Sequence, residues 1–184
     1  MRLVPRIDVS RLIQVCLMLL CGISCAQQTT PVGEMDRAKP AILSTELTIQ
    51  GLDGKTVNLT TADLAALPHK TVSVYNEHAK ANETYSGVAL VELLKKVNTP
   101  SGEAVRGKLF MTGVVAEGTD HYSVLYSLAE VDPSIHTGDV IVADSIGGRA
   151  LDQDGAFKLV STEEKRPARW VRNLTRIAVV AVQP

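Results

Sequence analysis

The sequence predicts an α+β fold with a mixed sheet or a barrel-like core, organised as a single domain. Strand-like runs dominate residues 45–182, and the few helix-like runs are short and irregularly spaced, unlike the regular alternation of a doubly wound parallel sheet. The chain has 184 residues, of which 45% are hydrophobic. This composition is sufficient for one buried core and excludes wholesale disorder, and the length leaves no room for two large domains.

Four regular elements are expected in the first half of this domain. Asp53-Gly54 is a hairpin signal, so the strand-like runs on either side are expected to pair as antiparallel strands. Thr60 or Thr61 can cap a short helix that ends before Pro68. We therefore expect, in order, strands over residues 45–50 and 56–59, a helix up to residue 67, and a strand over residues 71–75.

The clearest helical pattern covers residues 87–97. Its apolar residues recur at helical spacing, while Glu92, Lys95 and Lys96 fall on the opposite face. Beyond this helix we expect a short helical turn over residues 127–131, which Pro133 ends. The remaining strand-like runs are residues 108–116, 122–126, 139–143, 156–160 and 174–182.

Residues 1–26 are typical of a secretory signal and stand apart from the fold. Basic residues (Arg2, Arg6 and Arg11) precede a mostly apolar run over residues 12–23, and small residues flank Cys25. Residues 27–44 lack periodicity and are expected to form a flexible tether, so the folded domain is expected to span residues 45–184. All three cysteines lie in the signal segment, which leaves the domain without a thiol.

The processing of this segment decides the location of the mature chain. Cleavage after Ala26 would leave a soluble protein, periplasmic or secreted. Alternatively, residues 22–25 resemble a bacterial lipoprotein signal that lipidates Cys25, although Gly22 stands where that pattern usually has leucine. A third alternative is an uncleaved anchor, for which the apolar run is short, because a spanning helix needs about 20 apolar residues. Membrane attachment is expected only in the second and third cases.

The charge balance limits the classes of partner. The chain carries 19 basic and 20 acidic residues, a net charge of −1. A general nucleic-acid binder would normally be strongly basic, so that class is excluded. A small anionic ligand or a protein partner remains.

The densest group of candidate binding residues lies just before the last strand-like run. It holds four positive charges and an indole within eight residues: Lys165, Arg166, Arg169, Trp170 and Arg172. Arginine forks and lysines suit anionic groups, and an indole offers a flat face for stacking, so the segment suits an anionic ligand with a planar ring. The alternative is a solvated basic loop with Trp170 in the core.

A polar segment after the third expected strand supplies the other candidates, Asn76 and His78. It follows a strand, where ligand-binding loops often lie, and His78 can act as a base or a ligand. The alternative is an exposed loop histidine. Asp120 and His121 form a third polar segment, but they are too close in sequence to imply a pair. No metalloprotease, zinc-ribbon, P-loop or nucleophile-elbow motif occurs, the four histidines are scattered, and no metal site is predicted.

Four stretches, in order, resemble the molybdopterin-binding oxidoreductase domain, the catalytic fold of the sulfite oxidase family, and above all its small exported members. The first joins residues 47–51 with an "ADLAALP" turn at 62–68, and the second is "YSGVALVELL" at 85–94. The third joins "DHYSV" at 120–124 with "SLAEVDP" at 127–133. The fourth joins residues 155–160 with 165–177, so the resemblance covers nearly all of residues 45–182.

The resemblance implies a mixed-sheet α+β fold, with the basic segment near a pterin-binding cleft. Molybdopterin is then the candidate cofactor, and the basic side chains of that segment are the candidate contacts to its phosphate. In catalytic members a cysteine in the loop after the third main strand supplies a thiolate to molybdenum, and here residues 74–84 contain no cysteine. An imidazole or amide in its place would make an electronically different site.

Two functions are compatible with the absence of this cysteine. The first is an exported binding module that keeps the family fold and binds a small molecule or a partner without molybdenum chemistry. The alternative is an oxidoreductase with an altered molybdenum–pterin site, in which Asn76, His78 or solvent replaces the thiolate. Export of a folded, cofactor-loaded protein would require paired arginines in the signal. The arginines of this signal are isolated, which favours the binding module.

Overall fold

The computed structural model describes residues 42–182, which fall within one compact unit. The predicted signal segment and most of the predicted tether lie outside the described residues. Two five-stranded sheets and a few short helices make up the described chain. Within residues 42–182, no helix has the length and apolar character needed to cross a bilayer.

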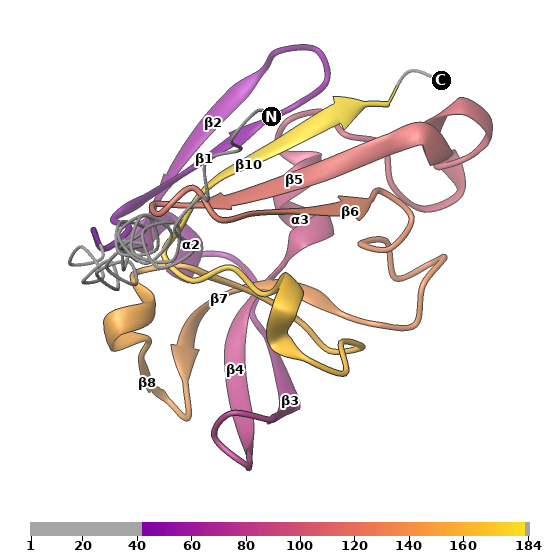
Figure 1. Ribbon diagram of the computed structural model, residues 1–184. Coiled ribbons are helices and arrows are strands. Elements are labelled where there is room, and N and C mark those ends of the chain that lie inside the picture. Colours follow the sequence, from indigo (N-terminus) through magenta and orange to yellow (C-terminus); the bar gives the residue numbers. More distant parts are fainter. Residues whose placement is uncertain (1–41, 183–184) are drawn as a thin grey trace, which may run out of the picture. The chain divides into compact units, whose positions relative to one another are not determined.

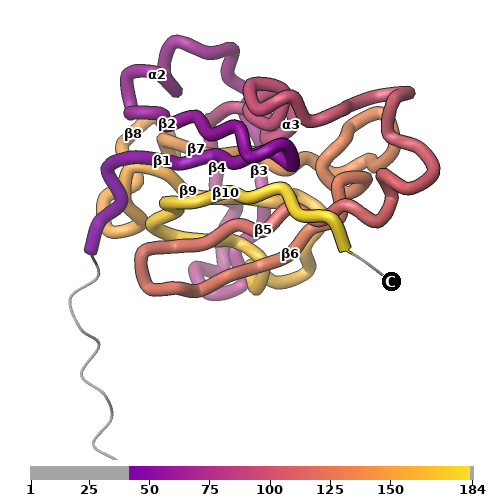
Figure 2. Tube along the Cα trace, turned by 90° about the horizontal axis from the view of Figure 1, so that it is seen from above, coloured from indigo at the N-terminus to yellow at the C-terminus, as the bar shows by residue number. Residues whose placement is uncertain are grey.

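The first sheet is mixed, as the sequence predicts. Its strand order is β2-β1-β10-β5-β6, which Figure 2 shows side by side in that order. The first and last strands of the described chain, β1 and β10, pair in parallel, and every other pair in this sheet is antiparallel. The bounds are β1 Glu46–Gln50, β2 Thr56–Thr60, β5 Thr112–Gly118, β6 Ser123–Ser127 and β10 Leu174–Ala181.

The second sheet is antiparallel and has the order β3-β4-β7-β8, with β9 also paired to β7. In Figure 1, β3 and β4 project together away from the first sheet. A single bridge between Leu159 and Val171 ties β9 to the segment that leads into β10. The bounds are β3 Lys70–Asn76, β4 Ala81–Ala89, β7 Val140–Ile146, β8 Arg149–Ala150 and β9 Lys158–Ser161.

The helices are short, and the first begins where its sequence signal predicts. Thr60 caps α2 through a capping box, because its hydroxyl accepts the Asp63 amide while the Asp63 carboxylate accepts the Thr60 amide at 2.8 Å. The α-helices are α2 Thr61–Ala65 and α3 Leu90–Lys95. The 3-10 helices are η1 Gly102–Ala104, η2 Gly107–Met111, η3 Asp152–Asp154 and η4 Pro167–Arg169.

The main core lies between the two sheets and takes buried side chains from both, together with the leucines of α3. A smaller cluster covers the other face of the second sheet. Lys158 and Val160 alternate with Leu159 along β9, so Lys158 faces this smaller cluster and Leu159 faces the main core. The members of the smaller cluster are Val72, Val74, Tyr85, Ile141, Ala143, Leu151, Val160 and Trp170.

The predicted helix over residues 87–97 is wrong at its beginning. The chain is still in strand β4 at Gly87 and Ala89, and the helix α3 covers only Leu90–Lys95. The strand prevails because its backbone pairs with β3 on one side and β7 on the other, contacts that a periodicity argument does not include. Val88 is one of the apolar residues on which the helix prediction rests. It is buried in the main core, but it reaches the core from strand β4.

Other boundaries also differ from the predictions. The first residues of the strand expected over 108–116 belong to the 3-10 helix η2, whose first residue, Gly107, has a positive φ of 59°. The chain becomes extended only at Thr112. Residues 128–131 form a turn without helix. The first half of β4 and the two-residue strand β8 were not predicted from the sequence.

His69 joins the end of the α2 segment to the second sheet, and its geometry predicts a pH dependence of stability. Its Nδ1 lies 2.8 Å from the Leu67 carbonyl and its Nε2 lies 2.8 Å from the Asp144 carboxylate, so only the imidazolium can donate to both. The hydrogen bond to Asp144 and then that to Leu67 raise the pKa of His69.

We expect this pair to stabilise the fold fully below the unfolded pKa of about 6.5, and to lose its effect as pH rises through the higher folded pKa. Urea unfolding of wild type and His69→Gln should therefore differ by roughly 1 kcal/mol in acid and converge in alkali. A difference that grows as pH rises would contradict this assignment.

Candidate functional site

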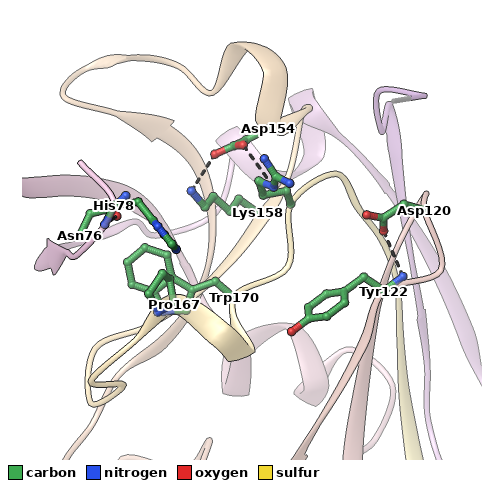
Figure 3. A pocket seen from close by; sticks show the side chains of 9 residues that line it. Asn76, His78, Asp120, Tyr122, Asp154, Lys158, Pro167 and Trp170 are labelled. Atoms are coloured by element: carbon green, nitrogen blue, oxygen red, sulfur yellow. Dashed lines mark hydrogen bonds and ion pairs between the residues drawn. The ribbon is translucent and has the colours of Figure 1, made fainter. Parts of the chain in front are cut away.

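A cleft of about 530 Å³ opens beside the smaller cluster and takes side chains from both sheets. Figure 3 shows that the β3–β4 turn forms one wall and the β5–β6 turn the opposite wall. The segments η3, β9 and η4 supply the surface between these walls. The lining residues are Asn76, His78, Asp120, Tyr122, Asp154, Lys158, Pro167, Trp170 and Arg172.

Lys158 is the buried cation of this cleft. Its residue is 6% exposed, and its Nζ donates to an Asp154 carboxylate oxygen at 2.7 Å and to the Tyr85 hydroxyl at 2.8 Å. The ammonium also lies 4.7 Å from the Tyr85 ring centroid and 5.4 Å from the Trp170 ring. An ammonium has three N–H donors, so within residues 42–182 one of them is left without a hydrogen-bond acceptor.

A chain of hydrogen bonds continues from Lys158 to the β3–β4 hairpin. The Tyr85 hydroxyl donates to Glu83 at 2.7 Å, and the Asn76 amide donates to the same carboxylate oxygen at 2.9 Å. Burial, followed by the hydrogen bond and charge of Glu83, raises the pKa of Tyr85. Tyr85 therefore stays a neutral phenol that receives one hydrogen bond and donates another, which fixes the position of Lys158 relative to the hairpin.

Trp170 belongs both to the core and to the cleft. It is 6% exposed, and its indole N–H donates to the Ser161 carbonyl at 2.9 Å. Its ring meets Tyr85 edge to face, with centroids 5.7 Å apart. Trp170 is thus held by the core, as the second alternative from the sequence expects, and it also lines the cleft.

The β3–β4 turn places Asn76 and His78 at the cleft. The Asn76 side-chain oxygen accepts the backbone amides of His78 at 2.9 Å and Ala79 at 3.2 Å, a local turn that asparagine favours. Lys80 then adopts a positive φ of 53° before β4 begins. Asn76 is therefore a structural residue as well as a lining residue, whereas His78 is exposed and points into the cleft (Figure 3).

The opposite wall is built on the β5–β6 turn. One Asp120 carboxylate oxygen accepts the Tyr122 amide at 3.0 Å, and His121 between them has a positive φ of 65°. The Tyr122 hydroxyl donates to the Ala168 carbonyl and so holds this turn against η4. Within residues 42–182, the second oxygen of Asp120 has no hydrogen-bond partner.

The structure separates the predicted basic residues into two groups. Trp170 and Arg172 line the cleft with Asn76 and His78, whereas Lys165, Arg166 and Arg169 do not. Lys165 and Arg166 are exposed.

Arg169 has a role away from the cleft. Its guanidinium donates to Glu130 at 3.0 Å and also pairs with Glu164, and it lies 4.4 Å from the Tyr126 ring centroid. These contacts tie η4 to β6 and the turn that follows it, and they direct the guanidinium to two carboxylates outside the cleft.

Sequence reasoning missed Lys158, Asp154 and Tyr85. A weak signal was present for Lys158, a charged residue inside the apolar run 156–160, where strand alternation requires it to share a face with buried residues. A lysine almost never lies inside unless it is paired, so this position predicts a carboxylate partner. Nothing in the sequence identifies that partner as Asp154.

The lining residues do not suit the molybdenum ligation of the catalytic family members. The cysteines all precede residue 42, so the donors at the cleft are an imidazole, an amide and carboxylates. Residues 42–182 contain no group of three or more His, Cys, Asp or Glu side chains placed to hold a metal ion. Thiolate is a soft, charged ligand, and none of these groups replaces it electronically.

Comparisons with known proteins support the predicted fold. No protein-family model matches the sequence. No curated protein matches it either. In structure the chain is similar to the sulfane dehydrogenase SoxCD from Paracoccus pantotrophus, with a TM-score of 0.58 and 22% sequence identity over 79% of this chain. The match covers 41% of that protein's chain. This likeness supports a sulfite-oxidase-like fold.

Proposed function

We propose that the chain is an exported binding module that keeps a sulfite-oxidase-like fold and holds a small molecule with an anionic group in the cleft. The observation that carries this proposal is the lining of the cleft, to which residues 42–182 contribute a buried, positioned lysine and a fixed indole but no thiolate donor. Such a site offers orientation and charge to a ligand.

Arg172 supplies the anionic preference. Its side chain is 72% exposed, and its nearest carboxylate oxygen, on Asp154, is 3.9 Å away. Its guanidinium therefore keeps free donors at the cleft, beside the remaining N–H of Lys158. The isolated arginines of the signal also favour export as an unfolded chain, to the periplasm or beyond, without a preloaded cofactor.

Native mass spectrometry of the full chain, purified after export from its native host, tests the proposal. We expect a bound small molecule that is released when the protein is denatured and that is neither a pterin nor a molybdenum species. Release of a stoichiometric molybdopterin would replace the binding module by the alternative, an oxidoreductase with an altered metal site.

A matched pair of variants should locate the bound molecule. Arg172→Ala and Lys165→Ala each remove one exposed cation from the same basic segment, but only Arg172 lines the cleft. We expect Arg172→Ala to lower the affinity about tenfold, because a hydrogen bond to a charged group contributes about 1.5 kcal/mol or more. Lys165→Ala should retain wild-type occupancy in native mass spectra. Equal losses in the two variants would place the ligand elsewhere.

A further inference from the structure

We infer that the ligand of this cleft is a small zwitterion, which carries both a carboxylate or similar anion and an ammonium or similar cation. This inference rests on the proposed ligand-binding function. It comes from the charged side chains of the cleft, two cations and two carboxylates, whose formal charges cancel.

Two of these four charges already neutralise each other. Lys158 and Asp154 form a close pair at 2.7 Å, with side chains 7% and 24% exposed. Their mutual attraction is weakly screened because solvent reaches little of the lysine. The pair is therefore part of the cleft wall, and its spare lysine N–H serves as a hydrogen-bond donor without adding net charge.

The other two charges remain available at the cleft. Arg172 has its nearest carboxylate oxygen at 3.9 Å, and one oxygen of Asp120 accepts no hydrogen bond within the described residues. No ion pair within 4.0 Å joins Arg172 to Asp120 in that part of the chain. The site thus presents one loosely paired cation and one carboxylate with a free oxygen, which a ligand of both signs satisfies.

The cleft that holds these two charges also has a flat surface. Trp170 and Pro167 line the cleft on the side that Figure 3 shows between Asn76 and Tyr122. Trp170 is held by its hydrogen bond to Ser161 and its contact with Tyr85, so a planar or apolar portion of the ligand would meet a fixed surface. A simple anion would use Arg172 and leave Asp120 to repel it.

Three probes of matched shape test this inference. L-phenylalanine carries both charges, 3-phenylpropanoate lacks the ammonium, and 2-phenylethylamine lacks the carboxylate. Trp170 is the only tryptophan of the chain, so its fluorescence reports binding at the cleft. We expect the full chain to bind L-phenylalanine at least about tenfold more tightly than either of the other probes.

Two variants test which residue contacts each charge of the ligand. Asp120→Asn should weaken L-phenylalanine binding about tenfold and leave 3-phenylpropanoate bound as tightly as before or more tightly, because the repulsion by Asp120 is removed. Arg172→Gln should weaken the binding of both probes. The inference is overturned if 3-phenylpropanoate binds as tightly as L-phenylalanine, if L-phenylalanine does not bind, or if Asp120→Asn affects both probes equally.

The chemical identity of the molecule released from the native protein tests this inference separately from the proposed function. A released small molecule that carries charge of only one sign would overturn the zwitterion and leave the binding module standing. Release of molybdopterin would overturn both. A released zwitterion whose occupancy falls in Asp120→Asn would support both.

Discussion

Lys158→Met is expected to lower the free energy of unfolding by about 3 kcal/mol, as for other buried ion pairs that lose one partner. The substitution leaves Asp154 with a poorly solvated charge and removes the hydrogen bond that Tyr85 accepts. Asp154 is 24% exposed, so the effect should fall near the lower end of the range for such pairs. Urea unfolding at neutral pH, with equal m-values for the two proteins, measures it.

Two further variants separate the ion pair from the loss of a lysine as such. Lys165→Met removes an exposed lysine and should change the unfolding free energy by at most about 0.5 kcal/mol. The double variant Lys158→Met with Asp154→Leu should recover most of the lost stability, because the one charge that then lacks its partner, on Arg172, is well solvated. A Lys158→Met protein as stable as wild type would show that the pair is dispensable.

Gly87→Ala is the second large expected effect. A Cβ at this position would lie 2.1 Å from the Val142 carbonyl oxygen and 2.4 Å from the Ala143 Cα, both backbone atoms of β7. Backbone cannot give way as a flexible side chain can, so β4 and β7 would have to separate where their register already shifts. We expect a loss of about 3 kcal/mol or more in thermal or urea unfolding.

Gly54→Ala is the matched control for this glycine. Gly54 has a positive φ of 81°, but a Cβ there would meet nothing within 4 Å. Its substitution should therefore cost only the left-handed backbone penalty of about 1 kcal/mol. If the two variants lost equal stability, close packing against β7 would not be the reason that position 87 requires a glycine.

Gly87 also shows how far the sequence predicts this fold. Signals that act within a few residues were sufficient to predict the β1–β2 hairpin at Asp53-Gly54 and the start of α2 at Thr60. The segment around Gly87 follows a helical period, yet β4 continues to Ala89 because its partners come from distant parts of the chain. The strand boundaries that failed are those decided by such long-range pairing.

The candidate site, too, could be predicted from the sequence only in part. Asn76, His78, Trp170 and Arg172 could be proposed because each lies in a locally conspicuous polar or basic segment, and all four line the cleft. The basic cluster alone could not show that Arg169 is paired with two carboxylates.

The buried centre of the cleft was beyond sequence reasoning. It joins Lys158 to Tyr85, 73 positions apart in the chain, and only the packing of the second sheet brings the two side chains together. The lysine within an apolar strand was a hint of a buried pair, but its aromatic neighbours Tyr85 and Trp170 follow from the fold.

The molybdenum content of the full chain, purified after export from a molybdenum-replete host with intact pterin synthesis, tests the central claim most directly. Elemental analysis and pterin extraction on the same sample give both stoichiometries. A binding module with no thiolate at its cleft predicts far less than one molybdenum atom and one pterin per chain. One molybdenum and one pterin per chain would contradict that function.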